Sequence, residues 1–132
     1  MTYQTPHAAT HKSTSDPLKI KSPIFFYYET TLNTSDKQPV VRIDTASNVV
    51  AVRVFRNNTS APGSNGTISI RRNGSEIYSL SIATGDSHQT WVTKSTSNTA
   101  LSSGDSISAV VTGAGSGITD ITIALDIEQT VI

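Results

Sequence analysis

The chain has 132 residues, ten basic and ten acidic side chains, a formal net charge of zero and no cysteine. The length fits one domain, and the lack of cysteine excludes disulfide scaffolds, thiolate zinc sites and cysteine nucleophiles. A neutral chain lacks the excess of lysine and arginine that phosphate binding requires, so nucleic acid is not an expected partner. About 38 serine and threonine residues and only 15% charged residues favour an all-β protein over a helical one.

The first 22 residues are polar, contain prolines at positions 6 and 17 and show no hydrophobic period. This pattern predicts an extended N-terminal arm over residues 1–22. We expect a neighbouring subunit to hold the arm, with an intrachain strand as the alternative. The region also lacks the apolar core of a signal peptide, and no run approaches the ~20 apolar residues of a membrane span. We therefore expect no cleaved leader and no membrane partner.

Residues 23–132 predict a β-sandwich domain, because short alternating segments are separated by turn residues. Val50, Val52 and Val54 are predicted to share one face of their strand. Asn73-Gly74 is typical of a two-residue hairpin turn, which needs positive φ at both positions. About eight strands at this spacing favour a jelly-roll-like antiparallel β-sandwich. The strands are expected over residues 24–32, 40–43, 49–55, 67–71, 76–82, 89–93, 106–112 and 121–127.

Two Gly-Asp-Ser segments, at residues 85–87 and 104–106, resemble the surroundings of a serine nucleophile. A nucleophilic serine needs a base, and the one histidine of the β domain is His88. It directly follows Ser87, so the two side chains would point to opposite faces of a strand. We interpret both segments as turns, in which glycine takes an unusual φ and aspartate accepts local amide hydrogen bonds. The chain is therefore predicted not to be an enzyme, and no catalytic residue is assigned.

A candidate partner surface involves the aromatic residues. The segment of residues 24–28 is aromatic on both of its faces, so we expect one face, with Phe25 and Tyr27, to meet a partner. Trp91 is assigned to the same surface. Trp91 beside Tyr78 is also a candidate platform for stacking a sugar ring.

A weaker candidate is a metal site in the arm. His7 and His11 lie four residues apart, and no helix is expected there. In a symmetric oligomer the same histidine from each chain could converge on an axis and bind a metal ion. No other cofactor is expected.

The segment of residues 7–18, HAATHKSTSDPL, resembles a motif that recurs in tail-fibre and other virion proteins of tailed bacteriophages. That motif reads His-x-x-Thr-His, a short spacer, Gly-Gly-Ser-Asp-Pro, then Ile or Leu. The spacer is one residue shorter here, and Thr14 stands where Gly-Gly is expected. The matching residues are His7, Thr10, His11, Ser15, Asp16, Pro17 and Leu18.

The β domain carries a second resemblance. Residues 67–75, 82–85 and 101–107 look like the small jelly-roll modules of phage fibres and particle surfaces. Bacterial spore-appendage subunits look broadly similar in this region, but the N-terminal cysteines that cross-link them are absent here.

Together the resemblances imply a non-enzymatic structural protein of a tailed phage particle, either a capsid decoration (cement) protein or a short fibre. It would be located in the virion after assembly in the host cytoplasm. Its implied partners are itself, as a homotrimer, and other virion proteins such as the major capsid or tail protein. Two alternatives are a receptor- or glycan-binding module with its site near Trp91 and residues 57–66, and a self-assembling bacterial appendage subunit. The arm residues assigned to assembly are His7, Thr10, His11, Asp16, Pro17, Leu18 and Ile20.

Overall fold

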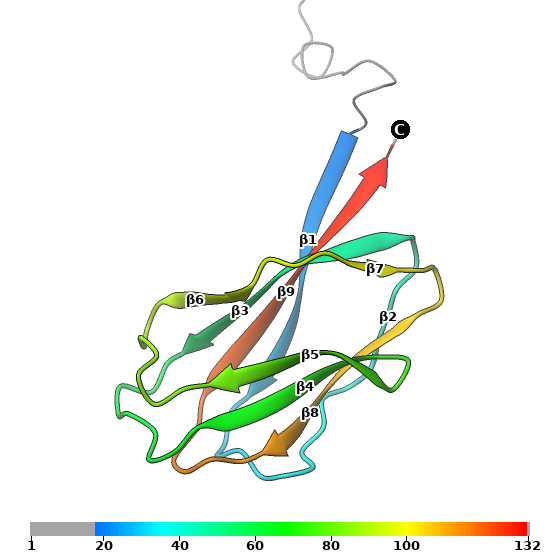
Figure 1. The fold of residues 1–132 in the computed structure, drawn as a ribbon. Helices are drawn as coiled ribbons and strands as arrows, with labels where there is room; N and C mark the ends of the chain where they lie inside the picture. Colours follow the sequence, from blue (N-terminus) through cyan, green and yellow to red (C-terminus); the bar gives the residue numbers. More distant parts are fainter. Residues whose placement is uncertain (1–17, 132) are drawn as a thin grey trace, which may run out of the picture.

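The computed structural model describes residues 18–131, which form two antiparallel β-sheets packed face to face (Figure 1). One sheet has the order β1-β9-β3-β6, with β7 also paired to β3, and the other has the order β2-β8-β4-β5. The predicted all-β, jelly-roll-like sandwich is confirmed. The strands are β1 (Leu18–Tyr28), β2 (Val41–Arg42), β3 (Ser47–Arg56), β4 (Gly66–Arg72), β5 (Ser75–Ile82), β6 (Trp91–Ser95), β7 (Thr99–Leu101), β8 (Ser106–Gly113) and β9 (Ile121–Val131). Within residues 18–131, no helix is long and apolar enough to cross a membrane.

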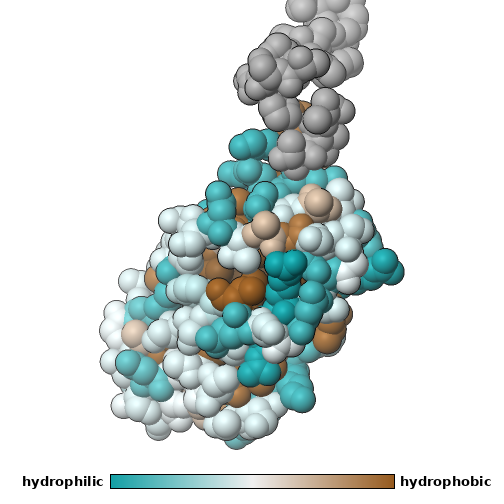
Figure 2. Space-filling view, turned by 45° about the vertical axis from the view of Figure 1, so that its right-hand side comes forward, coloured by the Kyte–Doolittle hydropathy of each residue, from teal (hydrophilic) through white to brown (hydrophobic). Residues whose placement is uncertain are grey.

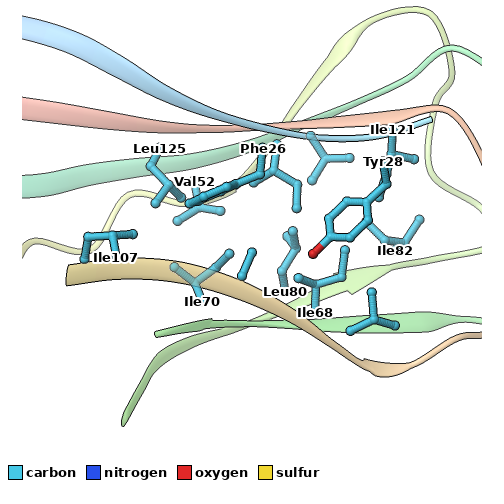
Figure 3. Packing of buried hydrophobic residues seen from close by; sticks show 14 of the residues in the cluster. Phe26, Tyr28, Val52, Ile68, Ile70, Leu80, Ile82, Ile107, Ile121 and Leu125 are labelled. Carbon is cyan, nitrogen blue, oxygen red and sulfur yellow. The ribbon is translucent and has the colours of Figure 1, made fainter. Parts of the chain in front are cut away.

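The core lies between the two sheets and follows from the alternation of side chains along each strand. In β9, Ile121, Ile123 and Leu125 are fully buried, as their spacing of two residues predicts. Figure 3 shows side chains of β1, β3 and β9 pointing toward those of β4, β5 and β8, with Phe26 and Tyr28 of β1 near the middle. One hydrophobic cluster therefore joins both sheets.

Strand β3 differs from its predicted pattern. Val52 and Val54 are buried as expected, but Val50 is only half-buried while Val49 is buried. The register with β9 shifts between Val49 and Ala51, because a β-bulge there adds one residue to the strand and reverses the faces before it. The prediction that Val50 shares the inward face is therefore wrong.

Strand β1 begins at Leu18, whereas residue 24 was the expected start. Leu18–Ser22, predicted as the end of the arm, pair with residues 127–131 of β9. This stretch is an intrachain strand, which was the alternative considered for the arm. Five of the assigned arm residues, and the proposed metal ligands among them, lie outside the described residues: His7, Thr10, His11, Asp16 and Pro17.

The paired ends of β1 and β9 run past the rest of the sandwich (Figure 1). The last residue of β9 that pairs with β3 in this direction is Glu128, opposite Asn48. We call residues 18–22 of β1 together with residues 127–131 of β9 the extension. β1 is the edge strand of its sheet, so one side of the extension carries backbone groups that no strand of the described chain pairs.

The predicted turns are present where the sequence placed them. Arg72 pairs with Ser75 across a two-residue turn, and Asn73 and Gly74 have φ of 50° and 84°. Both values lie in the left-handed region that a type I′ turn requires. The hairpin between β4 and β5 is therefore confirmed with its turn chemistry.

Both Gly-Asp-Ser segments form turns closed by the aspartate. Asp86 accepts a hydrogen bond from the Ala83 amide at 2.9 Å, and Asp105 accepts one from the Ser102 amide at 2.7 Å. Gly104 has the predicted positive φ of 91°, whereas Gly85 in the first turn has no positive φ. The prediction of an unusual φ is therefore wrong for Gly85. These aspartates stabilise turns, which is the role the sequence predicts for them.

Candidate functional site

Four aromatic side chains gather on the outer face of the β1-β9-β3-β6 sheet. We call Phe25, Tyr27, Phe55 and Trp91 the aromatic face. The Trp91 ring lies 6.5 Å from the Phe25 ring and 5.4 Å from the Phe55 ring, centroid to centroid, and both pairs are tilted. These spacings are typical of favourable aromatic contacts. The structure thus brings together Phe25 and Trp91, which the sequence assigned to one surface.

A small residue in β9 explains how rings from distant strands can meet. Ala124 points outward between the inward side chains Ile123 and Leu125, yet it is only 4% exposed. It pairs with Phe25 on one side and with Arg53 on the other. Because alanine is short, it leaves room on this side of β9 for the Phe25 and Trp91 rings to approach each other. The aromatic face is therefore a small hydrophobic cluster of its own, outside the main core.

Tyr27 is fixed by hydrogen bonds at both ends. Its hydroxyl donates to Asp120 Oδ1 at 2.7 Å, and the side-chain amide of Gln38 donates to its backbone carbonyl at 2.8 Å. Asn57 donates to the second carboxylate oxygen of Asp120 at 2.9 Å. The hydrogen bond to Asp120 raises the pKa of Tyr27, while the bonds from Asn57 and Tyr27 lower the pKa of Asp120.

Polar side chains border the rings on the same sheet face. Arg53 Nη2 lies 3.1 Å from Asp126 Oδ2, and both side chains are partly exposed. Thr93 pairs with Arg53 across the strands, and Thr122 lies between Tyr27 and Phe55. The charges of Arg53 and Asp126 compensate each other, so Asp120 beside Tyr27 is left as the negative charge near the rings.

The loop after β3 adjoins this face at its first residue, Asn57. Arg56 is buried, and its guanidinium donates to the carbonyls of Asn58, Ser60 and Asp86 at 2.7–2.8 Å. These bonds tie the start of the loop to the turn that precedes β6. The predicted proximity of residues 57–66 to the aromatic surface is thus seen at Asn57, which bonds to the same carboxylate as Tyr27.

The suggested pairing of Tyr78 with Trp91 is wrong. Tyr78 belongs to β5 in the opposite sheet, and its hydroxyl donates to the Lys94 carbonyl at 2.9 Å. Trp91 instead contacts Phe25 and Phe55. Phe55 was not among the predicted site residues because it lies near the end of a valine-rich strand, and only the strand order reveals that it pairs with Trp91.

The extension presents a second exposed surface, made of aliphatic side chains. Leu18 and Ile20 are 52% and 48% exposed, although alternation places them on the same side of β1 as the buried Phe26. A hollow of about 200 Å³ lies where this side meets β2, lined by Ser22, Ile24, Val41, Ile43 and Ile127 among others. On the face turned forward in Figure 2, apolar patches alternate with hydrophilic ones below the grey residues.

The opposite side of the extension is charged. Lys19 and Lys21 approach Glu128 at 3.5 Å and 3.9 Å. Such exposed ion pairs contribute little to stability. The extension is therefore amphipathic: one side is charged, and the other carries the aliphatic side chains of Leu18, Ile20 and Ile127 beside Ser22 and Gln129.

No metal centre is found among residues 18–131, where no three histidine, cysteine, aspartate or glutamate side chains lie close enough to hold an ion. His88 is exposed. His7 and His11 lie outside the described residues, so their assignment stays a prediction.

No protein-family model and no curated protein matches the chain. Among solved structures, the chain is similar to a family 35 carbohydrate binding module from an environmental isolate. The two share 18% sequence identity with a TM-score of 0.38, over 86% of this chain and 67% of that chain. A similarity of this degree carries no argument about function, which must come from the residues themselves.

Proposed function

We propose that the chain is a non-enzymatic structural protein of a tailed phage particle, a small surface component such as a decoration protein or a short fibre. The proposal rests on the resemblance carried by residues 7–18. The observation that supports it is the extension, since Leu18, at the end of that motif, and Ile20, just after it, have half-exposed aliphatic side chains. The aliphatic side of the extension and the residues before it would attach the chain to its neighbours.

The energetics of the extension favour a role in assembly. Beyond Glu128 only β1 and β9 pair. Such a two-stranded ribbon is marginally stable alone, and here it leaves apolar surface in water. Covering the exposed half of Leu18 and Ile20 would contribute roughly 1 kcal/mol each. The gain is small for one chain, but it adds up when several copies bury the same surface together.

We propose a homotrimer in which the aliphatic sides of three extensions face a common axis. The charged side, with Lys19, Lys21 and Glu128, would then remain in solvent. Closed symmetry lets each copy bury the same surface without leaving an open end. In this arrangement the sandwich domains would point away from the attachment point, with their serine- and threonine-rich surface toward solvent.

The test is to locate the chain on purified particles. An antibody against the sandwich domain should label tailed particles at repeated positions, and deletion of residues 1–17 should remove the label while the chain stays folded. Labelling of filaments on the bacterial surface would instead support the appendage alternative. Particles that lack the chain altogether would contradict the proposal.

A further inference from the structure

We propose that the aromatic face is a binding site for neutral carbohydrate. A sugar ring would stack on Trp91 and Phe25, and its hydroxyl groups would bind the polar side chains at the border. This goes beyond a structural role in a particle and does not depend on it.

The rings are held in place before any ligand arrives. Trp91 packs against Phe25 and Phe55, and Phe25 lies opposite Ala124 in the pairing of β1 with β9. Tyr27 is held by the hydrogen bond to Asp120. A preorganised surface loses little conformational freedom when it binds, which favours affinity.

The rings nevertheless stay open to solvent. Phe25 is 56% exposed, Tyr27 49% and Trp91 45%. Aromatic rings that served only to pack the sheet would be covered more completely. Their faces carry partial negative charge, which attracts the weakly positive C–H groups on the apolar side of a sugar ring.

The size of the apolar area favours a small ligand over a protein. With about half of each aromatic side chain exposed, the three rings offer on the order of 300 Å². A stable protein interface needs about 800 Å² on each partner. Beyond the rings this face is polar, with Arg53, Asp126, Thr93 and Thr122, so the apolar area does not extend further.

The charges at the border favour a neutral ligand. Arg53 is paired with Asp126, and Asp120 accepts hydrogen bonds from both Tyr27 and Asn57. The ion pair compensates its own charges, whereas the neutral donors leave the negative charge of Asp120 beside Tyr27, and this charge disfavours an anionic ligand. Arg53 is 46% exposed and Asp126 23%, so a guanidinium donor and a carboxylate acceptor are both within reach of adjacent sugar hydroxyls.

The single tryptophan of the chain lies in the proposed site and reports on it. The full chain is titrated with cellotriose, maltotriose and chitotriose while Trp91 fluorescence is recorded, with sialyllactose as the charged comparison. We expect saturable binding of at least one neutral trisaccharide with a dissociation constant of about 1 mM. Sialyllactose should bind at least tenfold more weakly.

Two variants separate stacking from folding. Phe25→Leu keeps an apolar side chain opposite Ala124 but removes the ring, and we expect binding to weaken at least tenfold while the chain stays folded with at most a small loss of thermal stability. Tyr78→Phe, on the other sheet, should bind like the natural chain. The proposal is overturned if no neutral sugar changes the fluorescence, if Phe25→Leu binds normally, or if Phe25→Leu changes the oligomeric mass, which would make the aromatic face a subunit interface.

Discussion

The two halves of strand β1 share one alternation of side chains but have different surroundings. In the second half, Phe26 and Tyr28 point into the core while Phe25 and Tyr27 form the aromatic face. In the first half, Leu18 and Ile20 point to the same side as Phe26 but remain half-exposed. The comparison shows that alternation determines which side of the strand a residue faces. Whether that residue is buried depends on whether the opposite sheet extends far enough to cover it.

The difference in burial indicates that the two halves of β1 have different roles. The second half holds the sandwich together, because its inward side chains fill the space between the sheets. The first half contributes little to that core and leaves its aliphatic side available to a partner. Substitutions in the two halves should therefore affect different properties of the protein.

The largest expected effect is on stability in the second half. Phe26→Ala should lower the free energy of unfolding by about 3–5 kcal/mol, since it leaves a cavity in the core. Ile20→Ala, in the first half, should lower it by less than about 1 kcal/mol. Urea unfolding monitored by circular dichroism measures both, under conditions where the chain is monomeric. Similar losses for the two variants would contradict the division of the strand.

A smaller effect is expected within the aromatic face. Phe25→Ala and Trp91→Ala should each be mildly destabilising, and a double-mutant cycle should give a coupling of about 0.5–1.5 kcal/mol between the two rings. The pair Phe25 and Val92 offers a control, because Val92 belongs to the same strand as Trp91 but points to the other face. A coupling near zero between Phe25 and Trp91 would show that the rings do not support each other in solution.

Two adjacent tyrosines provide a matched test of hydroxyl groups. The buried Tyr28 hydroxyl has no hydrogen-bond partner within the described residues, and burial raises the pKa of Tyr28 to about 12. Tyr28→Phe should therefore leave stability unchanged or raise it by up to about 1 kcal/mol. Tyr27→Phe removes a hydrogen bond and should not be stabilising. Thermal unfolding of both variants tests these expectations. A clear loss of stability in Tyr28→Phe would show that the Tyr28 hydroxyl has a hydrogen-bond partner in solution.

The raised pKa of Tyr28 also sets a direction with pH. In the unfolded chain a tyrosine ionises near pH 10, while the folded state keeps Tyr28 neutral to about pH 12. This group's contribution to stability is therefore complete below pH 10 and is lost as the pH rises toward 12. Tyr28→Phe should lose less stability than the natural chain over that range in alkaline unfolding experiments.

The smallest effect is a shift at Asp120. Hydrogen bonds from Asn57 and Tyr27 lower its pKa, so any stability it contributes is present above the ordinary aspartate range and lost as the pH falls through the lowered value. In Tyr27→Phe the pKa of Asp120 should rise toward its ordinary value. Carboxyl-carbon NMR titration measures it, with Asp36→Asn as a control that should not move it. An unchanged value in Tyr27→Phe would mean that this hydrogen bond is absent in solution.

Much of the fold could be predicted because its signals are local. The alternation of Ile121, Ile123 and Leu125 identified a half-buried strand, and Asn73-Gly74 identified the hairpin. Val50 was misplaced because a bulge depends on pairing with another strand, which periodicity alone does not report. β7, over Thr99–Leu101, was missed because three residues are too short to show a period.

The candidate site was only partly predictable for a related reason. Phe25, Tyr27 and Trp91 were assigned to a surface because apolar residues on an outward face need an explanation. Phe55 and Ala124 were not, since their importance arises from strands that are far apart in sequence and adjacent in the sheet. Polar neighbours such as Asp120 could not be predicted either, because the same tertiary arrangement brings them to the aromatic face.

The most direct test of the division along β1 is the solution mass by light scattering after size exclusion. The full chain should have the mass of three copies, and Leu18→Ser/Ile20→Ser should reduce it to one copy while the chain stays folded. Lys19→Ser/Lys21→Ser, on the charged side of the same strand, should leave the trimer intact. A full chain that is monomeric at every concentration tested, or a double aliphatic variant that keeps the trimer mass, would contradict the account.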